Sequence, residues 1–148
     1  MSEDRIERDT LIDASLERVW SLVATPGFWV ADEESVAGQV ATEGASLIAK
    51  NPNLGEVAVR VEKVDPPTYV AYRWASAFPG EGLRDDNSTL VEFTLSTEDG
   101  KTRLRVVESG FSALSTSEEA RDKAVRFNSE GWPQVFDMVK HRVEQSSV

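Results

Sequence analysis

The last segment of the chain contains its longest helical pattern and limits the folds open to it. From Ser115 to about Gln145, apolar residues recur at helical spacing, and a helix of that length is about 45 Å long. A stripe this broad must be buried against a partner surface. The apolar side holds Ala120, Ala124, Val125, Phe127, Gly131, Trp132, Val135, Phe136, Met138, Val139 and Val143. The opposite, polar side holds Lys123, Arg126, Glu130, Gln134, Asp137 and His141.

The residues before this helix predict strands that supply the partner surface. Arg5 to Asp13 alternates as a first strand, and later segments repeat apolar residues at period two. Asp99-Gly100 has the chemistry of a tight hairpin turn. The inward positions expected on these later strands are Val57, Val59 and Val61, then Val70, Tyr72 and Trp74, then Val91, Phe93 and Leu95, and finally Leu104, Val106 and Glu108.

Two short helices are expected after the first strand. Asp13 or Ser15 caps the first, and Thr25-Pro26-Gly27 ends it. Phe28 and Trp29 follow on a second short turn that packs inward. Weaker strand patterns cover residues 35–41 and 45–50. The whole order predicts one α+β domain over residues 1–148, with a curved seven-stranded antiparallel sheet around the long C-terminal helix.

The boundaries and shape of the long helix can also be predicted. Ser115 or Thr116 is expected to cap it, because Glu118 or Glu119 stands at capping-box spacing. Pro133 lies on the polar side and should bend the apolar side towards the sheet.

Charge and composition exclude several classes of function. The net charge of −10 argues against binding nucleic acid, whose phosphates would be repelled. The chain has no cysteine, and its lone histidine, His141, cannot form a metal cluster. No run approaches the roughly 20 apolar residues of a membrane span. The polar start lacks the apolar core of a signal peptide, so we expect a cytoplasmic protein without metal, cofactor or membrane span.

Several stretches of the chain match a known family pattern. They are Leu11–Ala14 with Val19-Trp20, Val64–Pro67 with Tyr72–Trp74, Thr89–Leu95, Gly100–Leu104, Glu108–Phe111 and Gly131-Trp132. Together they resemble START-like (SRPBCC) domains, most of all the branch of heat-shock-protein ATPase activator homologues (Aha-type). Ser15 departs from the family pattern where many relatives have proline, and so does Pro133 after the Gly-Trp pair. The resemblance implies a helix-grip fold: a sheet that grips the C-terminal helix, with an apolar cavity between them.

Two polar residues fall on faces that should be apolar. Glu108 continues the inward face of its strand, and Asn128 lies at the centre of the apolar helix face. Each could meet a ligand, and burial would raise the pKa of Glu108. Alternatively, Glu108 pairs with an arginine or meets solvent, and Asn128 satisfies a backbone group. Aromatic residues could line the same pocket or simply pack in the core. They are Trp20, Tyr72, Trp74, Phe93 and Trp132.

We therefore hypothesise a non-catalytic pocket for a small hydrophobic or amphipathic ligand, as carrier or sensor. The aromatic residues with Glu108 and Asn128 would bind the ligand, and no catalytic residue is assigned. Two alternatives stay open. One is a cyclase- or aromatase-type enzyme that uses Glu108, with Tyr72 as its only evident partner. The other, by analogy with the resembled branch, is an interaction module that regulates a chaperone.

Overall fold

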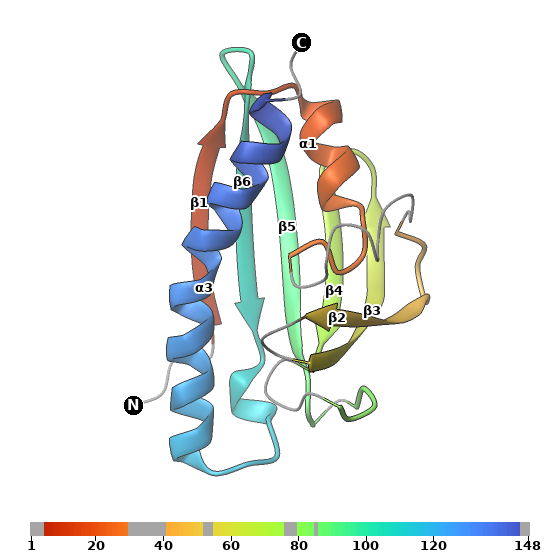
Figure 1. Cartoon of the computed structure of the whole chain (residues 1–148), viewed down its shortest axis with the longest axis vertical. Helices are drawn as coiled ribbons and strands as arrows, with labels where there is room; N and C mark the ends of the chain where they lie inside the picture. Colours follow the sequence, from red (N-terminus) through yellow and green to blue (C-terminus); the bar gives the residue numbers. More distant parts are fainter. Residues whose placement is uncertain (1–4, 30–40, 52–54, 76–79, 85, 146–148) are drawn as a thin grey trace.

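The computed structural model describes residues 5–29, 41–51, 55–75, 80–84 and 86–145. One face of an antiparallel sheet packs against the long C-terminal helix α3 (Figure 1). The strands are β1 (Arg5–Ile12), β2 (Ser46–Asn51), β3 (Gly55–Asp65), β4 (Tyr69–Trp74), β5 (Thr89–Glu98) and β6 (Lys101–Ser109). The helices are α1 (Leu16–Val23), the short 3-10 helix η1 (Phe111–Ala113) and α3 (Glu118–Gln145).

The sheet runs in the order β1-β6-β5-β4-β3-β2, and every neighbouring pair is antiparallel. It has six strands over the described residues, so the expected count of seven is wrong. The missing strand was expected at residues 35–41, of which only Ala41 is described. The Ala41 amide donates to the carbonyl of Ala24 at 2.7 Å, which ties this residue to the end of α1 instead of to a strand.

The predicted hairpin between β5 and β6 is confirmed. Glu98 pairs with Lys101 across a two-residue turn in which Asp99 and Gly100 have φ angles of 50° and 79°. Two consecutive positive φ values suit an Asp-Gly pair, because glycine carries no Cβ to clash. This turn sets the register that places the inward residues of both strands in the core.

The region after β1 is partly as expected. Ser15 caps α1 by accepting a hydrogen bond from the Arg18 amide, and Val19 and Val23 are buried. Phe28 and Trp29 lie in a turn after α1 and are buried, as expected. Residues 30–40 lie outside the described residues, so a second short helix is not confirmed.

Helix α3 differs from the prediction at its start and along one edge. Its cap is Ser117, whose hydroxyl accepts from the Ala120 amide at 3.1 Å; neither Ser115 nor Thr116 does this. Phe127 is 59% exposed, although it was placed on the apolar side. The buried line runs through Asn128, Trp132, Phe136, Val139 and Val143. Phe127 lies one residue before Asn128, and one residue turns a helix by about 100°. Its side chain therefore points away from the buried line.

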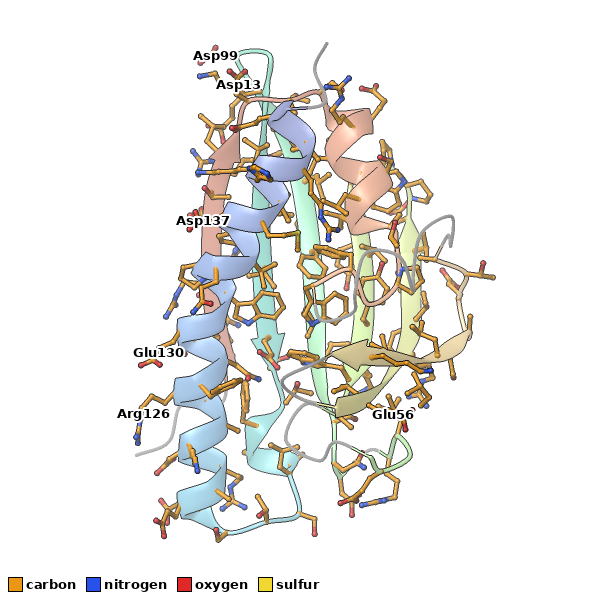
Figure 2. All side chains as sticks on the ribbon, in the orientation of Figure 1. Asp13, Glu56, Asp99, Arg126, Glu130 and Asp137 are labelled. Atoms are coloured by element: carbon orange, nitrogen blue, oxygen red, sulfur yellow. The ribbon has the colours of Figure 1, made fainter. Side chains whose placement is uncertain are left out.

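The outer side of α3 is polar, as the sequence predicts. Arg126, Glu130 and Asp137 are exposed and project outwards from the helix (Figure 2). Pro133 and His141 are exposed as well. The opposite side of α3 therefore faces the sheet and carries the polar residue Asn128 into the core.

Candidate functional site

A fully buried carboxyl group lies between the sheet and α3. It belongs to Glu108 on β6, whose exposed fraction is 0%. Period two places this side chain on the same face as Leu104 and Val106, both buried. The prediction that Glu108 points inward is therefore confirmed.

Four side chains donate hydrogen bonds to the Glu108 carboxyl. Its Oε2 accepts from Trp74 Nε1 at 2.8 Å and from Thr89 Oγ1 at 2.6 Å. The same oxygen accepts from Asn128 Nδ2 at 3.0 Å, and Oε1 accepts from Trp132 Nε1 at 3.0 Å. We call these five residues the Glu108 cluster.

Strand register and helical spacing bring the Glu108 cluster together. Glu108 pairs with Val91 across β5–β6, and Trp74 pairs with Thr89 across β4–β5. Thr89 lies two residues before Val91, so it shares the inward face and is diagonal to Glu108. Asn128 and Trp132 are four residues apart on α3 and so lie on one face. Three strands and one helix thus hold a single carboxyl group.

Burial and four neutral hydrogen-bond donors set the electrostatics of Glu108. All four groups that donate to its carboxyl are neutral. Burial raises the pKa of Glu108, while the hydrogen bonds from Thr89, Trp74, Trp132 and Asn128 act in the opposite direction. A buried carboxyl of this kind can orient a bound polar group or hold a proton.

Aromatic side chains surround the Glu108 cluster and meet at Trp29. The ring centre of Trp29 lies 5.0 Å from that of Tyr72, 5.4 Å from that of Trp74 and 6.3 Å from that of Trp132. All the ring pairs are tilted or edge-on, which suits aromatic packing. We call this set the ring cluster: Phe28, Trp29, Tyr72, Trp74, Phe93 and Trp132.

Trp29 also carries a buried polar atom without a partner. Its Nε1 is the one buried side-chain nitrogen or oxygen of the described residues that makes no hydrogen bond. Buried donors are nearly always paired, and a water molecule or a ligand is an ordinary explanation for an exception.

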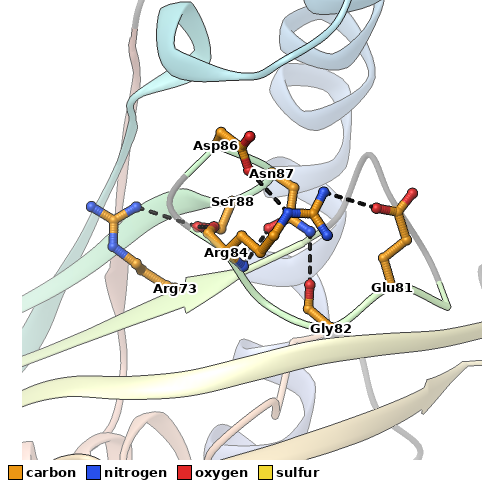
Figure 3. A network of polar contacts seen from close by, with 7 residues as sticks. All are labelled: Arg73, Glu81, Gly82, Arg84, Asp86, Asn87 and Ser88. Atoms are coloured by element: carbon orange, nitrogen blue, oxygen red, sulfur yellow. Dashed lines mark hydrogen bonds and ion pairs between the residues drawn. The ribbon is translucent and has the colours of Figure 1, made fainter.

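A polar loop fixes the start of β5, where Thr89 lies. Asn87 accepts from the Arg84 amide at 2.6 Å and donates to the carbonyl of Gly82 at 2.8 Å (Figure 3). The Ser88 hydroxyl donates to the Arg84 carbonyl at 2.6 Å. Asn87 and Ser88 are buried, so these bonds satisfy polar groups that precede Thr89 and hold that residue in position.

Most of the predicted ligand-binding residues come together. Trp74, Asn128 and Trp132 contact Glu108 directly, and Tyr72 and Phe93 belong to the ring cluster. Trp20 does not join them: it is half-buried on α1 and, among the described residues, makes none of the ring contacts of that cluster. The ligand-binding role of the residues that come together stays a prediction, and the place of Trp20 outside the ring cluster argues against such a role for it.

Tyr72 differs from its expected chemistry. Its hydroxyl donates to the carbonyl of Val23 at 2.6 Å, and burial raises its pKa far above the usual range. The hydroxyl therefore anchors the end of α1, while the ring faces Trp29 and Phe93.

Thr89 and Trp29 were missed as site residues. Period two counted back from Val91 would have placed Thr89 on the inward face. No local pattern gives the partners of Trp29, which lies in a turn.

The described residues contain neither a candidate metal-binding group nor a membrane-spanning helix. No group of three histidine or acidic side chains among them could hold a metal ion. Within the same residues, each helix is too short or too polar to cross a bilayer.

Comparisons with known proteins agree with this architecture. The family model described as "Activator of Hsp90 ATPase homolog 1-like protein" matches residues 13–144. A comparison with curated protein sequences found no match.

Solved structures share the fold at low sequence identity. Protein MLL2253 from Mesorhizobium loti is 18% identical with a TM-score of 0.73, over 97% of this chain and 99% of its own. The Aha1 dimer from Colwellia psychrerythraea is 17% identical with a TM-score of 0.68, over 99% of this chain and 100% of its own. DynU16, a putative protein in the dynemicin biosynthetic locus, is 20% identical with a TM-score of 0.71; the match covers 97% of this chain but 48% of DynU16.

Proposed function

Since the chain belongs to the family of activator of Hsp90 ATPase homolog 1-like proteins, we propose that it binds a small hydrophobic or amphipathic molecule, as a carrier or sensor without catalysis. The ligand would lie between the sheet and α3, against the ring cluster. Glu108 would orient it by holding Trp74 and Trp132 in place.

The buried carboxyl of Glu108 is the observation that carries this proposal. A carboxyl buried among neutral groups costs desolvation free energy, which its hydrogen bonds must offset. The sequence nevertheless places four donors around this one group. Polar groups that break the apolar pattern of a core are typical of functional sites.

The ring cluster sets the affinity to be expected. A ligand the size of an aromatic side chain buries about 150–250 Å², worth about 4–6 kcal/mol at 25 cal/mol per Å² before the costs of binding. Without those costs this would correspond to a Kd of about 1 mM to tens of µM, which is the tightest binding to expect. Screening must therefore use ligand concentrations from the high-micromolar to the millimolar range.

The test is a ligand screen with matched variants. Neutral aromatic compounds and single-chain lipids are added to the wild-type protein, and binding is read by ligand-detected NMR and by the rise in Tm. Trp74→Phe removes a donor to Glu108, whereas Trp20→Phe changes a tryptophan outside the ring cluster. Binding that weakens in Trp74→Phe and persists in Trp20→Phe supports the proposal. No binding by any compound would refute it.

An enzyme of the cyclase or aromatase type is the second candidate. The raised pKa of Glu108 favours it, because a general acid must hold its proton near neutral pH. Against it, the hydroxyl of Tyr72 is engaged with the Val23 carbonyl and so is a poor partner for Glu108. With a substrate in hand, full turnover by Glu108→Gln would exclude this mechanism.

Chaperone regulation remains an alternative drawn from the family description. A pull-down with purified Hsp90 tests it, with the Phe127→Ser variant as a surface control, since Phe127 is exposed on α3. If Hsp90 retains neither the wild-type protein nor the Phe127→Ser variant, this alternative is excluded.

A further inference from the structure

The unpaired indole nitrogen of Trp29 restricts the chemistry of the proposed ligand. Trp29 is 8% exposed, and its Nε1 is buried without an acceptor. An indole N–H can only donate. Whatever completes this site must therefore present a hydrogen-bond acceptor to it.

The position of Trp29 connects this donor to the Glu108 cluster. Its ring packs against those of Trp74 and Trp132, and both of these rings donate to Glu108. The Glu108 carboxyl already accepts four hydrogen bonds, about the number that its lone pairs allow. The Glu108 carboxyl therefore serves the four donors of its own cluster, and the acceptor for Trp29 Nε1 must come from another group.

The charge of the site argues against ionic ligands. An anionic ligand would lose its hydration beside a cluster that holds no cationic group, and an ionised Glu108 would repel it. An ammonium group has only donors to offer, so it would leave Trp29 Nε1 unpaired. A neutral oxygen atom carries no charge into the site and can accept the hydrogen bond of Trp29 Nε1.

We propose that the ligand is a neutral, ring-bearing molecule whose carbonyl or hydroxyl oxygen accepts the hydrogen bond of Trp29 Nε1. This inference rests on the proposed function and narrows its ligand class. Fatty acids and other anionic amphiphiles are excluded by it, and so are organic amines. The ring cluster supplies the apolar contact, and Trp29 selects the oxygen.

The experiment compares four compounds that share a naphthalene skeleton. Methyl naphthyl ketone has a neutral acceptor, and ethylnaphthalene has none. Naphthoate adds a negative charge, and naphthylmethylamine adds a positive one. We expect the ketone to bind about five- to tenfold more tightly than ethylnaphthalene, as one buried hydrogen bond allows. The two ionic compounds should bind more weakly than both.

The indole N–H signals of a ¹⁵N-labelled sample report the contact directly. The chain has four tryptophans, and single Trp→Phe variants assign their signals. The ketone should move the signal of Trp29 to lower field more than ethylnaphthalene does. In Trp29→Phe the preference for the ketone over ethylnaphthalene should vanish, whatever the change in the affinity for either compound. Trp20→Phe serves as the control that retains the preference.

The outcomes separate this inference from the function on which it rests. If compounds bind but the ketone has no advantage, or its advantage survives in Trp29→Phe, the role of Trp29 is overturned and the binding function stands. Tighter binding of naphthoate or of the amine overturns the neutral class. If no compound binds, both the proposed function and this inference fail. Should Trp29→Phe fold poorly, the shift of the Trp29 signal in the wild-type protein decides alone.

Discussion

Replacing Glu108 by leucine should destabilise the protein, although leucine is apolar and the site lies in the core. Leucine is similar in size and would gain about 1.5–3 kcal/mol from burial. It would also remove the acceptor of four buried donors. The sign of the effect depends on which of these contributions is larger.

The structure allows the magnitude to be estimated. The Thr89 hydroxyl can rotate to another acceptor, but three N–H donors, on Trp74, Asn128 and Trp132, lose the one that Glu108 supplied. Each unsatisfied buried donor costs about 1–3 kcal/mol, which gives about 3–9 kcal/mol. After the gain from leucine, we expect a net loss of about 4 kcal/mol, within limits of about 0–7.5 kcal/mol, from a total of about 5–15 kcal/mol.

Glutamine at the same position should cost less than leucine by about 2 kcal/mol or more. Its amide oxygen can keep the three bonds made by Oε2, while its NH₂ group meets the N–H of Trp132, so one bond is lost. In the Glu108→Gln background, Trp132→Phe should then cost about 1–2 kcal/mol less than it does in the wild type, because the hydrogen bond is already gone.

The assay is urea unfolding followed by far-ultraviolet circular dichroism, which does not depend on the tryptophans being changed. The wild type is compared with the single variants Glu108→Leu, Glu108→Gln and Trp132→Phe and with the Glu108→Gln/Trp132→Phe double variant. A leucine variant as stable as the wild type would refute the reasoning, because the donors would then have other partners. Additivity in the double variant would refute the assigned bond between Glu108 and Trp132.

Three further predictions follow from the same structure. Burial raises the pKa of Glu108 above its unfolded value near 4.5, so the folded protein binds this proton more tightly than the unfolded chain does. The stability of the wild type relative to Glu108→Gln should therefore fall as pH rises from about 4.5 towards neutral. Tm values of both proteins, measured at pH 5 and pH 7.5, check this sign. Ser117→Ala should cost about 0.5–2 kcal/mol of unfolding free energy as the loss of a helix cap, and Ser115→Ala should cost little; equal losses in urea unfolding would contradict the assigned cap. Phe136→Ala should cost about 3–5 kcal/mol because Phe136 is buried, whereas Phe127→Ala should change stability by about 0.5 kcal/mol or less; a large loss at Phe127 in the same assay would show that this residue is covered.

Periodicity predicted most of the fold because it reports which face of each element is buried. Val91 and Leu104 are buried and alternate with less buried neighbours on β5 and β6, and the Asp99-Gly100 turn fixes their register. The errors arose where the pattern was weak. Residues 35–41 alternate poorly, and Phe127 lies one residue from the buried line of α3, a distinction that apolarity alone does not make.

The candidate site was predictable only where its residues lie on periodic elements. Glu108 and Asn128 stood out because each interrupts an apolar face. Trp29 lies in a turn after α1, and its neighbours come from β4, β5 and α3. Such contacts depend on the tertiary arrangement. Tyr72 was correctly placed inward, but the partner of its hydroxyl, the Val23 carbonyl, is distant in sequence.

The most direct test of this account is a crystal structure of the protein grown with methyl naphthyl ketone at about ten times its Kd. We expect density for the ketone between the sheet and α3, against the ring cluster, with its oxygen within about 3 Å of Trp29 Nε1. Ketone bound only at the surface, with Trp29 Nε1 paired to a protein group or to water, would contradict it.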